Sequence, residues 1–177
     1  MRRILVVIDM QKDFIDGSLG TKEAESIVPA VVRKIRSYEK GAVFATKDTH
    51  EEDYMETQEG RNLPVAHCIR GTDGWAFPPE IQRVLEEQEA EIFEKPTFGS
   101  TALAERIKQL YEEEKGELSV ELAGLCTDIC VISNALLLKA NLPELLISLD
   151  STCCAGVTPE LHEAALATMK SCQIKVY

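Results

Sequence analysis

The sequence has no surplus of positive charge and no long hydrophobic run. Its 177 residues include 30 acidic and 19 basic side chains, and the resulting net charge of -11 repels nucleic-acid phosphates and anionic membrane surfaces. The apolar stretch at 4–8 ends at Asp9, well short of a signal-peptide core or a membrane span. These absences argue against nucleic-acid and membrane partners and predict a cytoplasmic protein.

Proline, glycine and repeated segments are also scarce. The 7 prolines and 10 glycines are too dispersed for a disordered or fibrous chain. The length suits one compact domain over residues 1–177. No Gly-x-Gly-x-x-Gly follows the first hydrophobic segment, which argues against a dinucleotide-binding protein. No organic cofactor is therefore expected.

Disulfide bonds are not expected, although the chain has 6 cysteines. Without a secretory signal these residues are predicted to be thiols, because the cytosol keeps cysteine reduced. Cys153 and Cys154 are adjacent and Cys172 stands alone, so they suggest no disulfide framework. The roles of these three residues and of Cys68 are left open.

Hydrophobic segments typical of strands alternate with segments of helical periodicity. The expected strands are 3–9, 42–46, 90–94, 118–125, 144–149 and 174–176, and the expected helices are 24–35, 79–87, 101–115, 128–140 and 159–171. The alternation implies right-handed βαβ crossovers. It predicts an α/β fold, a three-layer α/β/α sandwich with a largely parallel, Rossmann-like sheet of about six strands. The stretch 47–79 has no sustained periodicity, and a loop of this length is expected to be functional.

Ligands of a parallel sheet bind beyond the carboxyl ends of its strands. This rule selects Asp9, Asp48, Lys95 and the segment 126–130, each of which lies at or just past the end of an expected strand. An acid, a base and a thiol are thus expected on one edge of the sheet.

The motif GLCTDICV places Cys126 and Cys130 at a junction between a strand and a helix. If Thr127 or Asp128 caps the helix, Cys130 falls in the first turn, where the helix dipole lowers the pKa of a thiol. That position suits a nucleophile. The alternative is that both cysteines are small buried hydrophobic residues. The pair alone lacks the further ligands of a zinc site.

Asp9 and Lys95 follow strands in the motifs IDMQKDF and FEKPTFGS. Partial burial of Asp9 would raise its pKa toward values useful for a general base, but the residue could equally cap a turn. Lys95 could be a solvated strand end, or its ammonium could favour the thiolate of Cys130 and orient Asp9.

Two of the three histidines lie in the long stretch after the second strand. In TKDTH, Asp48 and His50 are two residues apart, so an extended backbone points both side chains to the same side. His67 follows in PVAH. An Asp-His-His set suits a hydrated divalent metal such as zinc, iron or manganese. His162, which follows Pro159, is expected to be structural.

Together, VVIDMQKDF, TKDTH, HCIRGTDG, EKPTFGS and GLCTDICV resemble the isochorismatase-like cysteine hydrolases, and most closely their nicotinamidase branch. The resemblance runs over essentially the whole chain in order and spacing. Two departures concern the substrate pocket: Leu63-Pro64 stands where Trp-Pro is common, and Asp150 is followed by Ser-Thr-Cys-Cys.

The resemblance implies a role for each motif residue. Asp9, Lys95 and Cys130 would form the catalytic triad. The backbone N–H groups of Cys126 and Cys130 would form an oxyanion hole, with a cis peptide between Leu125 and Cys126. Phe14 and Trp75 would flank the substrate. A divalent metal, zinc first and iron or manganese as alternatives, would be held by Asp48, His50, His67 and a candidate fourth ligand, Glu59.

The activity implied is hydrolysis of a small linear amide through a thioester, most closely nicotinamide to nicotinate and ammonia, a step of NAD salvage. The alternative within the family is an amidase acting on a ureido, carbamoyl or biuret-type substrate. A different class is a binding or partner protein that keeps the fold without activity. The resemblance also implies a homo-oligomer, in which the loop 53–62 could take part.

Overall fold

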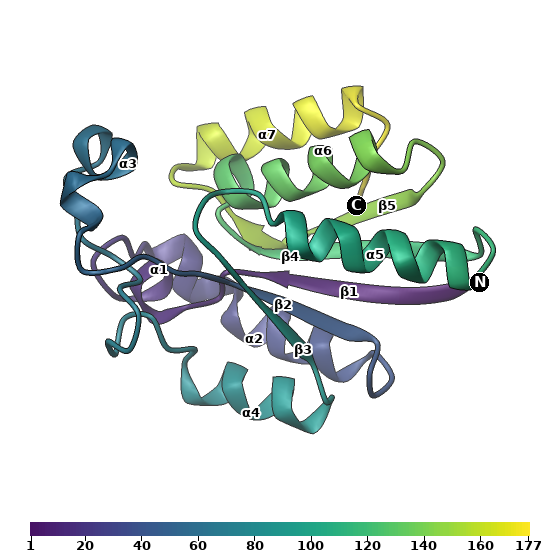
Figure 1. The fold of residues 1–177 in the computed structure, drawn as a ribbon, viewed down its shortest axis with the longest axis horizontal. Coiled ribbons are helices and arrows are strands. Elements are labelled where there is room, and N and C mark those ends of the chain that lie inside the picture. The colour runs from purple at the N-terminus through teal and green to yellow at the C-terminus, as the bar shows by residue number, and fades with distance from the viewer.

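The core of the protein is one six-stranded sheet, which lies between two groups of helices in Figure 1. The computed structural model describes residues 1–177. Its strands are β1 (Arg2–Ile8), β2 (Val43–Asp48), β3 (Glu91–Lys95), β4 (Leu118–Leu125), β5 (Leu146–Ala155) and β6 (Lys175–Val176). All of them pair in parallel, in the order β3-β2-β1-β4-β5-β6. The predicted α/β fold with a parallel sheet is confirmed.

Helices cover both faces of this sheet, as the sandwich prediction requires (Figure 1). The helices of the chain are α1 (Lys12–Ile15), α2 (Lys22–Arg36), α3 (Gln58–Asn62), α4 (Pro79–Glu87), α5 (Thr101–Glu113), α6 (Ile132–Asn141) and α7 (Pro159–Ser171). Of these, α3 does not cover the sheet but lies beyond the carboxyl ends of the strands. In β1, Ile4 and Val6 belong to the core under α5, α6 and α7, whereas Leu5 belongs to the core under α2 and α4. Alternate residues of a central strand thus fill two cores, which explains the uninterrupted apolar run.

Three differences from the expected elements lie near the carboxyl ends of the strands. The fifth strand does not end at Leu149 but continues to Ala155, after a register shift that pairs Gly124 with Cys154. The expected helix at 128–140 begins with a separate π-helical turn, η2 (Thr127–Val131). The long stretch after β2 contains a 3-10 turn, η1 (Tyr54–Glu56), and α3. Elements of three to five residues are too short to show a period in sequence.

Gly124 lets the ends of β1 and β4 approach each other closely. Its φ is +122°, and a Cβ atom there would lie 2.1 Å from the carbonyl oxygen of Ile8. No side chain fits in this space. Gly124 therefore sets the spacing between the strands that carry Asp9 and Cys126 at their ends.

We expect Gly124→Ala to lower the free energy of unfolding by about 3 kcal/mol, because overpacking adds to backbone strain. Gly41→Ala is the matched control. Gly41 also has a positive φ, +73°, but a Cβ atom there would meet no other part of the protein within 4 Å; strain alone should cost about 1 kcal/mol. Urea denaturation of the two variants measures the difference, and equal losses would contradict a steric role for Gly124.

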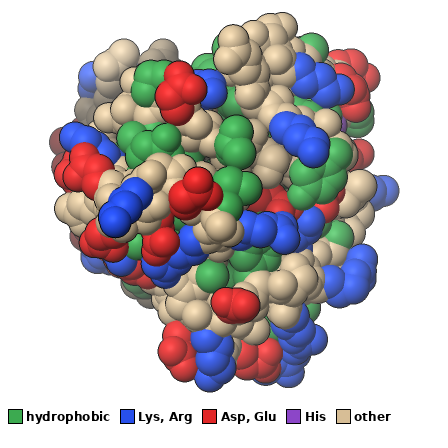
Figure 2. Space-filling model, turned by 90° about the vertical axis from the view of Figure 1, so that its right-hand side faces the viewer, with side chains coloured by type: hydrophobic (Ala, Val, Ile, Leu, Met, Phe, Trp, Pro, Cys, Tyr) green, Lys and Arg blue, Asp and Glu red, His purple; other side chains and the backbone are tan.

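The face at the amino-terminal ends of the strands carries charges of both signs (Figure 2). Ion pairs such as Arg2–Glu114 and Lys40–Glu89 account for part of this mixture. The excess of acidic residues therefore does not form one uniform acidic surface on this face. Among the helices, none has the length and apolar composition needed to cross a bilayer.

Candidate active site

Four strand ends bring charged and nucleophilic side chains into one buried site. Asp9 follows β1, Asp48 ends β2, Lys95 ends β3, and Cys130 lies in η2 just after β4. Their exposed fractions are 0% for Asp9, 4% for Asp48, 2% for Lys95 and 5% for Cys130. Charged side chains are almost never this deeply buried unless they are paired. The structure therefore brings together the residues that were selected from the sequence because they lie at the carboxyl ends of strands.

Asp9 is held in place by its neighbour on β2. The Thr46 hydroxyl donates to Asp9 Oδ1 over 2.6 Å and accepts from the Asp9 N–H over 3.2 Å. The other oxygen, Oδ2, lies 2.7 Å from Lys95 Nζ but makes no regular hydrogen bond. Burial raises the pKa of Asp9, as expected from the sequence, and the Lys95 ammonium opposes the rise. Asp9 is thus a buried carboxylate that is ion-paired with Lys95 through Oδ2.

Lys95 contacts every other charged or reactive group of the site. Its Nζ lies 2.7 Å from Asp9 Oδ2, 3.3 Å from Asp48 Oδ1 and 3.5 Å from Cys130 Sγ, and it donates to the Thr97 carbonyl over 2.9 Å. Burial alone would lower the pKa of Lys95, but the surrounding carboxylates and thiol outweigh it and raise the pKa above its usual value. Lys95 is therefore a permanent cation beside the sulfur.

The Cys130 thiol is not activated by a helix terminus, contrary to the sequence expectation. Neither expected residue caps η2: the Thr127 hydroxyl pairs with His162 Nδ1 at 2.8 Å, and Asp128 Oδ1 accepts the N–H of Val157 over 2.9 Å. Burial, with the Asp9 carboxylate next in weight, raises the pKa of Cys130 well above its usual value. The cap on which the expected lowering of the Cys130 pKa depended is absent, and desolvation is the largest cause of the shift. The thiol needs a base to lose its proton.

Cys126 lies at the start of the same turn. The Leu125–Cys126 peptide is cis, as the sequence resemblance implied. The carbonyl of Cys126 accepts the N–H groups of Ile129 and Val131, which shapes η2. Burial raises the pKa of the Cys126 thiol to about 12, so this sulfur stays protonated. The oxyanion hole formed by the Cys126 and Cys130 N–H groups remains a prediction.

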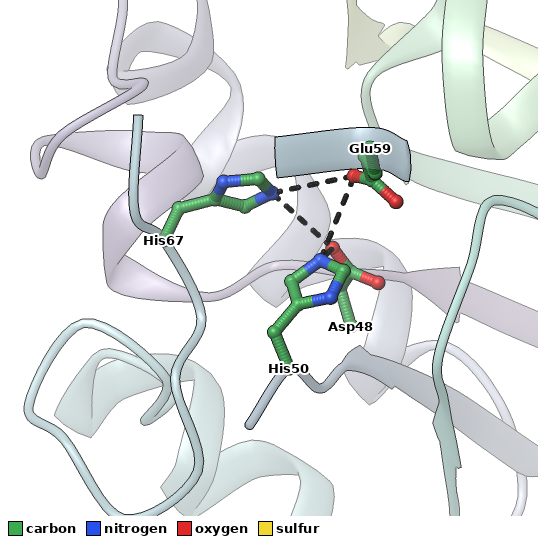
Figure 3. A group of neighbouring side chains, drawn as sticks. All are labelled: Asp48, His50, Glu59 and His67. Atoms are coloured by element: carbon green, nitrogen blue, oxygen red, sulfur yellow. Dashed lines mark hydrogen bonds and ion pairs between the residues drawn. The ribbon is translucent and has the colours of Figure 1, made fainter. Parts of the chain in front are cut away.

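A candidate metal site adjoins these groups. The side chains of Asp48, His50, Glu59 and His67 point toward one another from the end of β2, from α3 and from the following loop (Figure 3). One ligand atom from each lies within 4.8 Å of the others. Each histidine Nε2 is 3.0–3.8 Å from the Asp48 and Glu59 oxygens. The structure thus brings together the expected Asp-His-His set and Glu59.

The donor chemistry of this cluster fits a divalent ion. Ligand atoms about 2.0–2.1 Å from a tetrahedral zinc lie roughly 3.3 Å apart, inside the observed spread. His67 Nδ1 lies 2.8 Å from the Val65 carbonyl, so an Nδ1–H donor would leave Nε2 free to bind. Asp48 turns Oδ2 to the histidines and Oδ1 to Lys95. The Asp48 carboxylate therefore connects the candidate metal site with the candidate triad of Asp9, Lys95 and Cys130.

Gln11 is a positioning residue that the sequence interpretation missed. Its side-chain oxygen accepts the Asp48 N–H over 2.7 Å, and its Nε2 donates to the carbonyls of Asp48 and Trp75 over 2.8 and 2.9 Å. Gln11 is fully buried and supplies hydrogen bonds to Asp48 on its β1 side, where the pairing of β1 with β2 ends at Ala45. Its place two residues after Asp9 was the available signal. Asp13, also in this motif, accepts the Cys68 N–H and anchors the long loop.

The sulfur of Cys130 opens into a small cavity that continues into a larger one. The inner cavity of about 50 Å³ is lined by Phe14, Leu19, Asp48, Glu59, Leu63, His67, Phe98, Cys126, Ile129 and Cys130. The outer cavity of about 650 Å³ shares four of these residues and lies between α3 and the loop 96–98. Phe14 therefore lies in the wall, as predicted. Leu19, Leu63, Phe98 and Ile129 were not anticipated.

Trp75 does not line either cavity, so the structure does not bring it together with Phe14 as the expected pocket wall. Its indole N–H donates to the Thr49 hydroxyl over 2.9 Å, and the Lys47 ammonium lies 3.1 Å from its ring centre. Side chains alternate along β2, so Lys47 and Thr49 face away from Thr46 and Asp48. Leu63, which stands where tryptophan is common in similar sequences, lines both cavities.

All six cysteines are free thiols in the structure, as expected. Cys68, Cys153 and Cys154 are buried, and none of these three lines either cavity. His162 pairs with Thr127, in keeping with the structural role expected for it.

The fold is a three-layer α/β sandwich with a parallel sheet. A thiol, an acid and a cation gather beyond its strand ends, where proteins of this fold class bind their ligands. The isochorismatase domain matches residues 3–177 of this sequence, and the chain belongs to that family. Its relatives support a hydrolase of the amidase type.

Three relatives illustrate the range of this similarity. The chain is 26% identical to a nicotinamidase of Schizosaccharomyces pombe, over 97% of the chain and 91% of the relative. It is 28% identical to an Arabidopsis thaliana protein named "probable inactive nicotinamidase", over 97% and 89%. The crystal structure of a Pyrococcus horikoshii pyrazinamidase in complex with zinc superimposes with a TM-score of 0.79 at 29% identity, covering 100% and 99%.

Proposed function

We propose that the protein is a cysteine-dependent amidohydrolase that converts nicotinamide and water to nicotinate and ammonia. The observation that carries the proposal is the buried Asp9–Lys95–Cys130 cluster, in which Lys95 Nζ lies 2.7 Å from Asp9 Oδ2 and 3.5 Å from the Cys130 sulfur. The nicotinamidase and pyrazinamidase relatives support the choice of substrate.

In the first half of the proposed reaction, Asp9 takes the proton of the Cys130 thiol and the sulfur attacks the amide carbon. Burial raises the pKa of Asp9, which makes it a stronger base, and Lys95 offsets the negative charge of the thiolate. Backbone N–H groups of Cys126 and Cys130 would bind the oxyanion. Asp9 then returns the proton to the leaving nitrogen, the C–N bond breaks, and ammonia departs.

In the second half, Asp9 takes a proton from a water molecule whose oxygen attacks the thioester carbon. The C–S bond breaks, the proton returns from Asp9 to the Cys130 sulfur, and the carboxylic acid leaves. Lys95 keeps its proton throughout, because its raised pKa holds it as a cation. The triad is restored with no net change.

A divalent ion, zinc in this proposal, would be held by Asp48, His50, Glu59 and His67. It would supply a Lewis acid for a ring nitrogen or an equivalent acceptor of the substrate. Phe14 lies beside this cluster, with its ring 5.5 Å from that of His67. A planar ring placed between the cluster and Cys130 would be oriented with its carbonyl toward the sulfur.

The charge of the cavity walls separates the candidate substrates. Neither cavity is lined by Lys or Arg, whereas Asp48 and Glu59 are acidic. An amide that also bears a carboxylate would find no free Lys or Arg to pair with, since Lys95 is already surrounded by Asp9 and Asp48, and the carboxylates of Asp48 and Glu59 would offset the charge of a bound divalent ion. A neutral amide is therefore favoured. The remaining alternative is a neutral ureido or biuret-type amide.

A panel of amides assayed for ammonia release tests this proposal. Nicotinamide and pyrazinamide should be hydrolysed, biuret more slowly, and N-carbamoyl amino acids not at all. No ammonia from any neutral amide, with metal-loaded protein, would favour a non-catalytic protein. The relative named as inactive makes this outcome a real alternative.

Replacing a candidate metal ligand should remove the metal. We expect His50→Ala to weaken zinc binding by on the order of 100-fold or more, because one of four converging ligand atoms is lost. Glu51→Gln is the control, since Glu51 is an exposed carboxylate in the same loop that pairs with Arg70. Competition with a chromophoric chelator measures both affinities. Equal zinc affinity in the wild type and His50→Ala would reject the assigned site.

A further inference from the structure

Asn134 is a buried polar residue whose side chain joins two parts of the site. It lies in the first turn of α6 and is 1% exposed. Its Nδ2 donates to the carbonyl of Cys130 over 2.8 Å and to that of Phe98 over 3.1 Å, and its Oδ1 accepts the N–H of Ser100 over 2.9 Å. Both amide donors and the acceptor are thus used.

The segments that Asn134 links carry the candidate nucleophile and its cation. Cys130 belongs to η2, where the helix is π-helical and less regular than α6. The loop after β3 contains Thr97, whose carbonyl accepts a hydrogen bond from Lys95, and Phe98, which lines both cavities. Apart from the Lys95 contact itself, Asn134 provides direct hydrogen bonds between this loop and the Cys130 turn.

We propose that Asn134 is a positioning residue that fixes the Cys130 sulfur against Lys95 by bonding the Cys130 carbonyl and the loop 98–100 with one amide. It does not contact the reacting atoms. The effect on turnover rests on the proposed amidase function, whereas the effect on the sulfur does not.

Asn134→Leu tests this role, because leucine has a similar size and no polar atoms. We expect kcat for nicotinamide to fall by about 10- to 100-fold with KM changed by less than about threefold, since small displacements of reacting groups act on the chemical step. Alkylation of Cys130 by iodoacetamide, followed by mass spectrometry, should slow by about tenfold at neutral pH. Its pH profile should move to higher pH as the sulfur leaves the Lys95 ammonium.

Asn134→Thr is the partial rescue. A threonine hydroxyl in a helix can donate to the carbonyl four residues earlier, here that of Cys130, but cannot replace the bond to Phe98. Both rates should be intermediate between those of the wild type and Asn134→Leu. If the leucine variant fails to fold, the threonine variant alone decides.

Asn141→Leu is the matched control. Asn141 lies on the same helix and donates to the carbonyl of Leu137 over 2.9 Å, but it is exposed and distant in sequence from η2. Its variant should keep wild-type kcat and alkylation. Folded Asn134 variants with unchanged alkylation, or an equal loss in Asn141→Leu, would overturn the proposal. A wild type that hydrolyses no amide would remove the proposed function and leave the alkylation test intact.

Discussion

Cys130→Ala should abolish amide hydrolysis, with a loss on the order of 10⁴-fold or more in kcat, while the protein remains folded. The reason is that the Cys130 sulfur is the thiol that lies beside the Lys95 ammonium, whereas Asp9 and Lys95 are positioned to move a proton and offset charge, not to attack. Steady-state ammonia release, with the detection limit set by a mock-purified sample, measures the loss. The alanine is smaller than cysteine and leaves the cavity lining otherwise intact.

Two further cysteine variants show whether the effect is specific to this sulfur. Cys172→Ala, in a partly exposed cysteine at the end of α7, should keep wild-type activity. Cys126→Ala should lose about tenfold at most, because the proposed contribution of Cys126 comes from its backbone N–H. A Cys130→Ala protein with substantial activity would refute the nucleophile assignment, and inactivity of both Cys126 and Cys130 variants would require both sulfurs.

Much of the fold follows from one property of central parallel strands. Ile4 and Leu5 face different cores, so β1 is apolar at every position from Ile4 to Ile8 and is visible as a continuous run. The extension of β5 begins with the polar residues Asp150, Ser151 and Thr152. Its buried part, Cys153–Ala155, is only three residues long, so it left too short a hydrophobic signal to extend the expected strand. The π-helical turn at Thr127–Val131 depends on hydrogen bonds to the Cys126 carbonyl that no residue pattern reveals.

The candidate site was predictable to the extent that strand ends determine it. Asp9, Lys95 and Cys130 were selected because the carboxyl ends of parallel strands meet at one edge. The position of Trp75 could not be predicted, because composition does not tell on which face of the sheet a loop residue packs. Its contacts with Lys47 and Thr49 place it on the side of β2 opposite to Asp48. Gln11 and Asn134 act through backbone groups of other segments, and such contacts require the tertiary structure.

Lys95→Met should have the second large effect, on stability as well as activity. Lys95 Nζ lies 2.7 Å from Asp9 and 3.3 Å from Asp48, and all three side chains are buried. Removing the cation leaves two buried carboxylates without it, which costs about 3–5 kcal/mol of unfolding free energy when one partner of a buried pair is lost. Chemical denaturation at pH 8 measures this loss, and kcat should fall because the thiolate loses its counter-charge.

The pH dependence of that loss identifies its origin. Burial raises the pKa of Asp9, and Lys95 now opposes the rise, so the methionine variant should have a still higher Asp9 pKa in the folded state. A group whose folded pKa lies above its unfolded value favours folding at low pH and loses that contribution as the pH rises through the folded pKa. Lys95→Met should therefore be less destabilised at pH 5 than at pH 8.

Adding Asp9→Asn to Lys95→Met tests whether the unpaired Asp9 carboxylate causes the loss of stability, because the amide removes that charge. The double variant should be more stable at pH 8 than Lys95→Met alone and should lose most of the difference between pH 5 and pH 8, although it is inactive. Arg3→Met, which breaks a more exposed pair with Glu121, is the comparison and should cost no more than about 1 kcal/mol. Equal losses of unfolding free energy in Lys95→Met and Arg3→Met would show that the buried ion pairs of Lys95 do not stabilise the fold. The position of Lys95 beside Cys130 would then have to be explained by packing alone.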